Sequence, residues 1–267
     1  MKIGIEGARY GKAVYGSTAI PNSAGKTLRG FCPFEIWREL LANRAMLITK
    51  YYKKLQSLVK FRALTFDKLL ERERICLYAG DLPGMPGYEK FVGLSLSQAN
   101  RWHINHDLTK PYPLPDNCVE MFQSEDVFEH IDLDLLPAAI TEIYRILKPG
   151  GLFRLGLPDY RCDVLVNRSI KGANGKVIFD PKGGGAFVNG KVVNAGHVWF
   201  PLIENVRDLL AQTPFRNLDF RHYYNEQGEA VMNPIDYSIS HVKRTPDHDP
   251  RVQNPRRPMS LVVDCTK

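Results

Sequence analysis

Apolar and polar positions follow two different periods in the middle of the chain, from Val119 to Leu157. Residues 119–124 form a short β-prone segment, and residues 152–157 alternate little, as expected for a strand buried on both faces. Between them, residues 133–147 carry apolar side chains at helical spacing. Pro149 and the Gly150-Gly151 pair end this helix, since proline lacks an amide and glycine takes positive φ. The pattern predicts a strand–helix–strand unit with parallel strands.

This unit also predicts which side chains form the core. Ile140, Ile143 and Leu147 should face the sheet from one side of the helix. Leu152, Leu155 and Leu157 should be buried in the strand that follows.

The same reading predicts further elements on both sides of this unit. Strands are expected at residues 75–79, 91–94 and 102–105 before it, with a loop rich in glycine and proline at 80–87. After it we expect a glycine-rich insertion near 165–196, with a hairpin pairing 176–179 with 186–188. A helix from residue 202 and strands at 215–220 and 260–264 should follow. A long loop of this kind at the edge of a sheet is usually a lid or a binding loop.

The first 74 residues form a separate region in this reading. Residues 1–33 lack periodicity and predict loops, whereas residues 34–59 predict an amphipathic helix with a basic face. That helix has two interpretations: it packs on its own domain with its lysines in solvent, or it lies on an anionic membrane surface. Residues 61–70 predict a second helix. The domains expected are therefore an extension at 1–74 and a larger domain at 75–267.

Composition narrows the class of protein only partly. The 267 residues are 44% hydrophobic and 24% charged, which predicts a folded chain with a sizeable core. The net charge of +7 permits binding to nucleic acid, anionic lipid or anionic sugar without choosing among them. Five scattered cysteines without a CxxC pair indicate neither disulfides nor zinc, and no signal peptide or long apolar run is present. We therefore expect a cytoplasmic protein without a transmembrane segment. The oligomeric state is not readable from these features.

Three segments carry a resemblance to a known family. They are residues 106–119, which begin His106-Asp107-Leu108, residues 127–131, which include Glu129-His130, and residues 142–151, which end Pro149-Gly150-Gly151. In this order and spacing they resemble the class I S-adenosylmethionine-dependent methyltransferases. The resemblance covers residues 75–267. It implies a Rossmann-like α/β sheet of order 3-2-1-4-5-7-6, with the last strand antiparallel, helices on both faces and S-adenosylmethionine as the cofactor.

The resemblance also implies where the cofactor binds. Its residues would follow the first four strands, and they are Gly80, Asp81, Ser95, Asp107, Leu108, Ser124 and Glu125. Two features depart from the family: the loop lacks a Gly-x-Gly sequence, and Ser95 stands where a carboxylate usually binds the ribose. A hydroxyl binds ribose more weakly than a carboxylate does. Asp107 has two interpretations, as the residue that contacts the adenine amino group or as a turn cap.

Three residues are candidates for the chemistry. His197 opens the helix after the insertion and is the main candidate for a base, Asp159 follows the fifth strand, and His130 follows the fourth. We found no metal site, because the spacing of His241, His248 and the nearby aspartates matches none.

The predicted function is methyl transfer to a small-molecule or sugar-like acceptor. The alternative is a methyltransferase-like scaffold that has lost cofactor binding and serves as a binding module. A nucleic-acid methyltransferase ranks last, because the chain lacks the base-pocket motif of that class.

Overall fold

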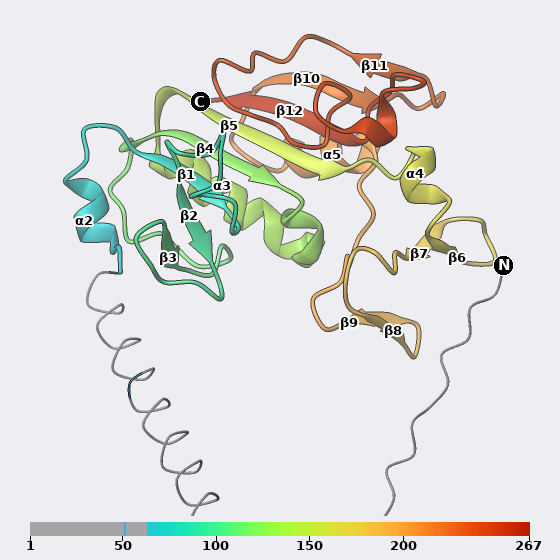
Figure 1. Ribbon diagram of the computed structural model, residues 1–267, viewed down its shortest axis with the longest axis horizontal. Coiled ribbons are helices and arrows are strands. Elements are labelled where there is room, and N and C mark those ends of the chain that lie inside the picture. The colour runs from blue at the N-terminus through green and yellow to red at the C-terminus, as the bar shows by residue number, and fades with distance from the viewer. Residues whose placement is uncertain (1–50, 52–62) are drawn as a thin grey trace, which may run out of the picture. The chain divides into compact units, whose positions relative to one another are not determined.

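The computed structural model describes residue 51 and residues 63–267 (Figure 1). The chain divides into two units, Met1–Lys53 and Lys54–Lys267, and the description below concerns the second. The predictions for residues 1–33 and 34–59 lie outside the described residues. The helix predicted at 61–70 is observed in part as α2 (Phe66–Leu70). No helix of the described residues is long and apolar enough to cross a membrane.

One mixed sheet of eight strands organises this unit (Figure 1). In spatial order the strands are β3 (His103–Asn105), β2 (Val92–Ser95), β1 (Cys76–Ala79), β4 (Val119–Glu125), β5 (Leu147–Pro158), β12 (Ser260–Thr266), β10 (Asn217–Tyr224) and β11 (Ala230–Met232). The first five run parallel, and β12 runs antiparallel to both β5 and β10. The predicted order 3-2-1-4-5-7-6 is confirmed, and β11 adds one further edge strand.

The main core lies between this sheet and two helices, α3 (Leu136–Ile146) and α5 (Ile203–Ala211). Ile140 and Ile143 on α3 are fully buried, as are Leu155 and Leu157 on β5, and these predictions are confirmed. Leu152 is only partly buried and belongs to a cluster on the other face, because side chains alternate along a strand.

The boundary between helix and strand also differs from the prediction. A 3-10 turn, η2 (Leu133–Leu135), precedes α3, and β5 begins directly at Leu147, before Pro149. The second face of the sheet carries smaller apolar clusters, one around Tyr88 and Phe91 and one that includes Ile235 and Val242 from the segment 233–258. A 3-10 turn in that segment is η3 (Pro250–Val252).

The insertion after β5 contains two hairpins instead of the predicted one. After the short helix α4 (Asp163–Val166), β6 (Ile170–Lys171) pairs with β7 (Val177–Phe179), and β8 (Ala186–Val188) pairs with β9 (Lys191–Val193). The predicted pairing of residues 176–179 with 186–188 is wrong. Asn189-Gly190 forms a two-residue turn with φ of 50° and 77°, and such a turn fixes the pairing of the strands beside it.

Candidate active site

A cavity of about 280 Å³ lies at the carboxyl ends of the parallel strands β1 to β4. Six residues that the sequence singled out line it: Gly80, Asp81, Ser95, Asp107, Leu108 and His130. Because the carboxyl ends of parallel strands meet at one edge, residues far apart in the sequence come together there. The cavity also has apolar walls from Leu94, Val127 and Ile131.

Gly80 brings the backbone to the wall of this cavity. Its φ is +105°, a conformation that side chains disfavour, and its amide donates to the Leu94 carbonyl at 2.9 Å. A Cβ at this position would lie 3.2 Å from Cγ2 of Val127. A single glycine therefore keeps the first loop close to the end of β4, although the expected Gly-x-Gly is missing.

Ser95 lines the cavity, but its hydroxyl oxygen already has donors. It accepts from the amides of Ser97 at 3.1 Å and Gln98 at 3.0 Å, so it caps the turn after β2. Ser97, which the sequence reasoning did not single out, also lines the cavity.

Asp107 caps its own turn through one oxygen only. Oδ1 accepts from the amide of Thr109 at 2.9 Å and from its hydroxyl at 2.8 Å, and these bonds lower the pKa of Asp107. Within the described residues no donor reaches Oδ2. The turn cap therefore leaves one oxygen of an ionised carboxylate available to a ligand.

Two residues predicted to contact the cofactor do not line the cavity. Ser124 is fully buried inside β4. Glu125 lies on the opposite face of the sheet and accepts from the Tyr88 hydroxyl at 2.9 Å and the Lys243 amide at 2.7 Å. The prediction was wrong because β4 continues to Glu125, so the side chain of Glu125 points away from the cavity. Asp126, the next residue, is the acidic residue that lines it.

Asp126 was not among the predicted site residues. It has a positive φ of 56° and forms an ion pair with Arg244 at 3.0 Å. Arg244 lies between His241 and His248, in a stretch that the sequence analysis considered only as a metal site.

Asp159 is a structural residue and does not contact the cavity. It is completely buried, and its two oxygens accept from the backbone amides of Arg161 at 3.0 Å and Tyr224 at 2.8 Å. Burial raises its pKa to about 6. The predicted contact with a substrate is therefore wrong: Asp159 joins the end of β5 to β10.

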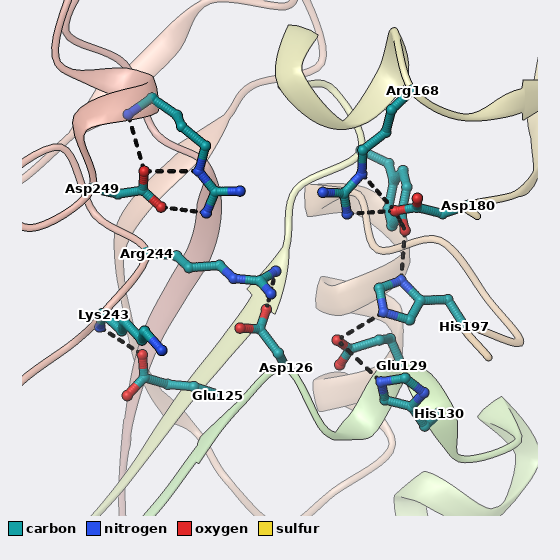
Figure 2. A network of polar contacts seen from close by, with 12 residues as sticks. Glu125, Asp126, Glu129, His130, Arg168, Asp180, His197, Lys243, Arg244 and Asp249 are labelled. Carbon is teal, nitrogen blue, oxygen red and sulfur yellow. Dashed lines mark hydrogen bonds and ion pairs between the residues drawn. The ribbon is translucent and has the colours of Figure 1, made fainter. Parts of the chain in front are cut away.

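His130 and His197 meet at Glu129, next to the cavity (Figure 2). Glu129 and His130 lie in a 3-10 turn, η1 (Phe128–His130), and His197 lies in the loop between β9 and α5. Nε2 of His197 is 3.5 Å from Oε1 of Glu129, and Nε2 of His130 is 3.9 Å from the same oxygen. The amide of Val198 donates to the Glu129 carbonyl at 2.9 Å, which holds the two segments together.

The other ring nitrogen of each histidine is fixed by a hydrogen bond. Nδ1 of His130 lies 3.0 Å from the carbonyl of Ala195, which can only accept, so Nδ1 carries the proton. Nδ1 of His197 lies 2.5 Å from the Tyr160 hydroxyl, which itself donates to Asp180 at 2.8 Å. The hydroxyl oxygen therefore accepts from His197. In the neutral form of each imidazole, Nε2 then carries the lone pair, and both Nε2 atoms lie toward Glu129.

Further charged residues support this arrangement. Arg168 donates to Asp180 at 2.6 Å, a contact that the sequence gave no means of finding. Burial raises the pKa of Glu129 well above its usual value, and burial with the nearby His130 lowers the pKa of His197 to about 4. Gly183 of the insertion lies against the ring of His197, where a Cβ would be only 2.7 Å from Cδ2.

A second cavity of about 510 Å³ lies beyond Tyr160. Tyr160, Trp199 and Phe200 supply aromatic walls, and its polar lining residues are Arg161, Lys171, Lys176 and Asn205. Because Tyr160 lines this cavity and also bonds to His197, the second cavity adjoins the histidine cluster.

Comparisons with known proteins give one family and several solved structures. Residues 86–155 match the family model described as a methyltransferase domain. An S-adenosylmethionine-dependent methyltransferase from Thermotoga maritima is 16% identical with a TM-score of 0.44, over 83% of this chain and 97% of that one. One from Archaeoglobus fulgidus is 12% identical with a TM-score of 0.43, over 88% and 100%. The search of curated proteins found no match.

Proposed function

We propose that the chain is a class I S-adenosylmethionine-dependent methyltransferase, which transfers a methyl group from this cofactor to a hydroxyl of a small-molecule or saccharide acceptor. The match of residues 86–155 to a methyltransferase domain and the observed strand order support this proposal. The observation that supports the proposal most is a single cavity. It gathers residues from the ends of four parallel strands and extends to His130, beside His197.

The residues of this cavity fit S-adenosylmethionine. Gly80 lets the backbone approach the ligand, and the unpaired Oδ2 of Asp107 can accept from the adenine amino group. The apolar side chains of Leu108 and Ile131 suit the adenine ring. Asp81 and Ser97 are the polar groups that we propose for the ribose hydroxyls, since the oxygen of Ser95 is already used by its own turn.

The acceptor is proposed to lie on the side of His197. The second cavity combines three aromatic side chains with several hydrogen-bond donors, a combination suited to a saccharide, whose rings have apolar faces and polar rims. Its cationic side chains favour an acceptor that carries negative charge.

Each group then has a defined role in the transfer. The cofactor supplies a methyl group on a sulfonium, and the protein holds the acceptor oxygen in line with it. His197 activates the hydroxyl through the lone pair on Nε2, because Nδ1 is held by Tyr160. The insertion, through Gly183, covers the imidazole and excludes water.

Cofactor binding is tested by calorimetry with S-adenosylhomocysteine. Asp107→Asn keeps the oxygen that caps the turn and removes the second acceptor, so we expect affinity to fall about tenfold, the effect of one hydrogen bond. Asp116→Asn is the matched control, because this exposed aspartate pairs with Arg145 and does not line the cavity. The absence of any heat with the wild-type protein and with Ser95→Asp would instead support the scaffold alternative.

Turnover is tested with radiolabelled S-adenosylmethionine and a panel of neutral and anionic saccharides. His197→Ala should abolish methyl transfer and leave the affinity for S-adenosylhomocysteine nearly unchanged, because the imidazole acts on the acceptor. Unchanged turnover in this variant would refute the assignment of His197.

A further inference from the structure

Glu129 has a buried carboxyl group without a hydrogen-bond partner among the described residues. Its side chain is fully buried, and within residues 63–267 neither oxygen accepts a hydrogen bond. Burying an unpaired carboxylate costs several kcal/mol, so such groups are normally paired with a cation or bound to a metal. Arg244, whose charge acts on Glu129, is already paired with Asp126, and Arg168 is paired with Asp180.

The two histidines do not satisfy Glu129 by hydrogen bonding. The distances of 3.5 Å and 3.9 Å from its Oε1 to their Nε2 atoms are too long for hydrogen bonds of ordinary strength. Moreover, the bonds of Nδ1 to Tyr160 and Ala195 leave Nε2 as the lone-pair nitrogen of each neutral imidazole. Three side chains that can each offer an electron pair therefore converge on one point.

The spacing of these donors suits a metal ion. One ligand atom from each of the three residues can be chosen so that all lie within 4.8 Å of one another. Four ligands placed tetrahedrally at about 2.1 Å from zinc are separated from one another by about 3.4 Å, close to the two observed distances. Small side-chain rotations would close the difference.

The bonds to Nδ1 complete the pattern. Histidines that bind metals usually donate the other ring proton to a carbonyl or an acidic group, which fixes the ring and its tautomer. His130 donates to the Ala195 carbonyl, and His197 donates to Tyr160, which is bonded in turn to Asp180.

We infer that Glu129, His130 and His197 bind one divalent transition-metal ion of the zinc type. Two imidazoles and one carboxylate favour zinc or a neighbouring first-row metal over Mg²⁺ and Ca²⁺, which prefer oxygen ligands alone. Three protein ligands leave a fourth position open. The inference deepens the proposed function, and rests on it only in one respect: the open position is where the acceptor oxygen would bind. With the Nε2 lone pair of His197 on the ion, the ion takes over from the free imidazole the activation of that oxygen.

The ion itself is tested without any turnover assay. Protein stripped of metal with a chelator is titrated with ZnCl₂ by calorimetry, and with Co²⁺ by visible absorption. We expect one ion per chain and a cobalt spectrum typical of nitrogen and oxygen ligands. Glu129→Gln and His130→Asn should each weaken binding at least tenfold, and the partly exposed His130 makes its variant the safer one for folding.

Two further variants distinguish metal binding at this site from incidental metal binding elsewhere on the protein. Tyr160→Phe removes the partner of His197 Nδ1 and should weaken metal binding by about 10- to 100-fold, the range for such supporting groups. His222→Gln removes a buried histidine on β10 outside the cluster and should leave the affinity unchanged.

The inference is overturned if stripped wild-type protein binds no Zn²⁺, or if Glu129→Gln and His130→Asn bind it as tightly as wild type does. Thiolate-to-cobalt charge-transfer absorption would overturn it too, because it would place the ion on cysteine.

Calorimetry with S-adenosylhomocysteine on the same samples is independent of these results. Cofactor binding without metal binding would leave the proposed function intact, and the reverse result would refute only that function.

Discussion

Two groups of buried charges in this protein are built in opposite ways. On the sheet face opposite α3 and α5, Arg154 of β5 forms two bonds to Asp264 of β12, at 2.7 Å and 2.9 Å. Its remaining nitrogen donates to Ser240 and to the Asp236 carbonyl. At the carboxyl edge of the sheet, Glu129 is equally buried and has no donor among the described residues (Figure 2).

The difference between these groups indicates what each is for. A buried ion pair with all its hydrogen bonds formed fixes the relative position of the strands that carry it. A buried carboxylate without bonds costs free energy in the isolated protein, and selection retains such a cost where a ligand offsets it. We therefore read the Arg154 cluster as structural and the Glu129 cluster as functional, and we expect mutations in them to act differently.

The largest loss of stability is expected at the satisfied pair. Asp264→Leu would leave Arg154 buried without its partner and should lower the free energy of unfolding by about 3–5 kcal/mol. Urea denaturation of the purified variant measures this loss. The double variant Arg154→Met/Asp264→Leu is the control, and it should be clearly more stable than the single variant because no unpaired charge remains. Equal stability of the two variants would contradict the structural reading.

The apolar core beside both clusters should respond almost as strongly. Leu155 is fully buried on the helix side of β5, so Leu155→Ala should cost about 2–5 kcal/mol through lost contacts and a cavity. Leu70→Ala on α2 is the matched control, since that side chain is 42% exposed and its loss should cost about half a kcal/mol or less. Thermal or urea denaturation of both compares them. A loss below half a kcal/mol at Leu155 would show that its placement is wrong.

In its hydrogen bonding, Asp159 is intermediate between the Arg154 and Glu129 clusters, because it is buried but accepts two backbone hydrogen bonds. Its pKa is raised by burial to about 6, above the value of 3.8 for a free side chain, so the folded state binds this proton more tightly. The stabilisation is complete below about pH 4 and is lost as the pH rises through 6. From pH 4 to 7 the wild type should lose about 2–2.5 kcal/mol relative to Asp159→Asn.

Denaturation of both proteins over this pH range measures the difference between them. A difference that does not change with pH would mean that Asp159 titrates normally in the folded state.

The sequence predicted the scaffold better than the site, for a physical reason. Strands, α3 and the strand order depend on local periodicity and on rules of connection, so β1 to β5 were found close to their observed positions. The roles of Glu125 and Asp159 depended on which way a strand's last side chain points and on which distant amides reach it. Asp159 meets Tyr224 across 65 residues.

The same limit explains the missed metal ligands. Glu129 and His197 are separated by 68 positions in the sequence, and only the folded insertion brings them together. By contrast, the observed pairing of β8 with β9 had a local signal in the sequence, the Asn189-Gly190 turn, which the prediction did not use.

The smallest change in stability is expected at the unsatisfied carboxylate. Glu129→Gln replaces the unbonded carboxyl group with an amide that can donate to the lone pair of a neighbouring Nε2, so stability without metal should change by less than about 1 kcal/mol and can increase. With Zn²⁺ at 100 times its dissociation constant, the wild type should gain about 2.7 kcal/mol, and the variant should gain little. Thermal unfolding of both proteins, with chelator and with Zn²⁺, gives the four values. A loss of several kcal/mol in chelator would mean that Glu129 supports the fold as Asp264 does, and the contrast between the two clusters would then fail.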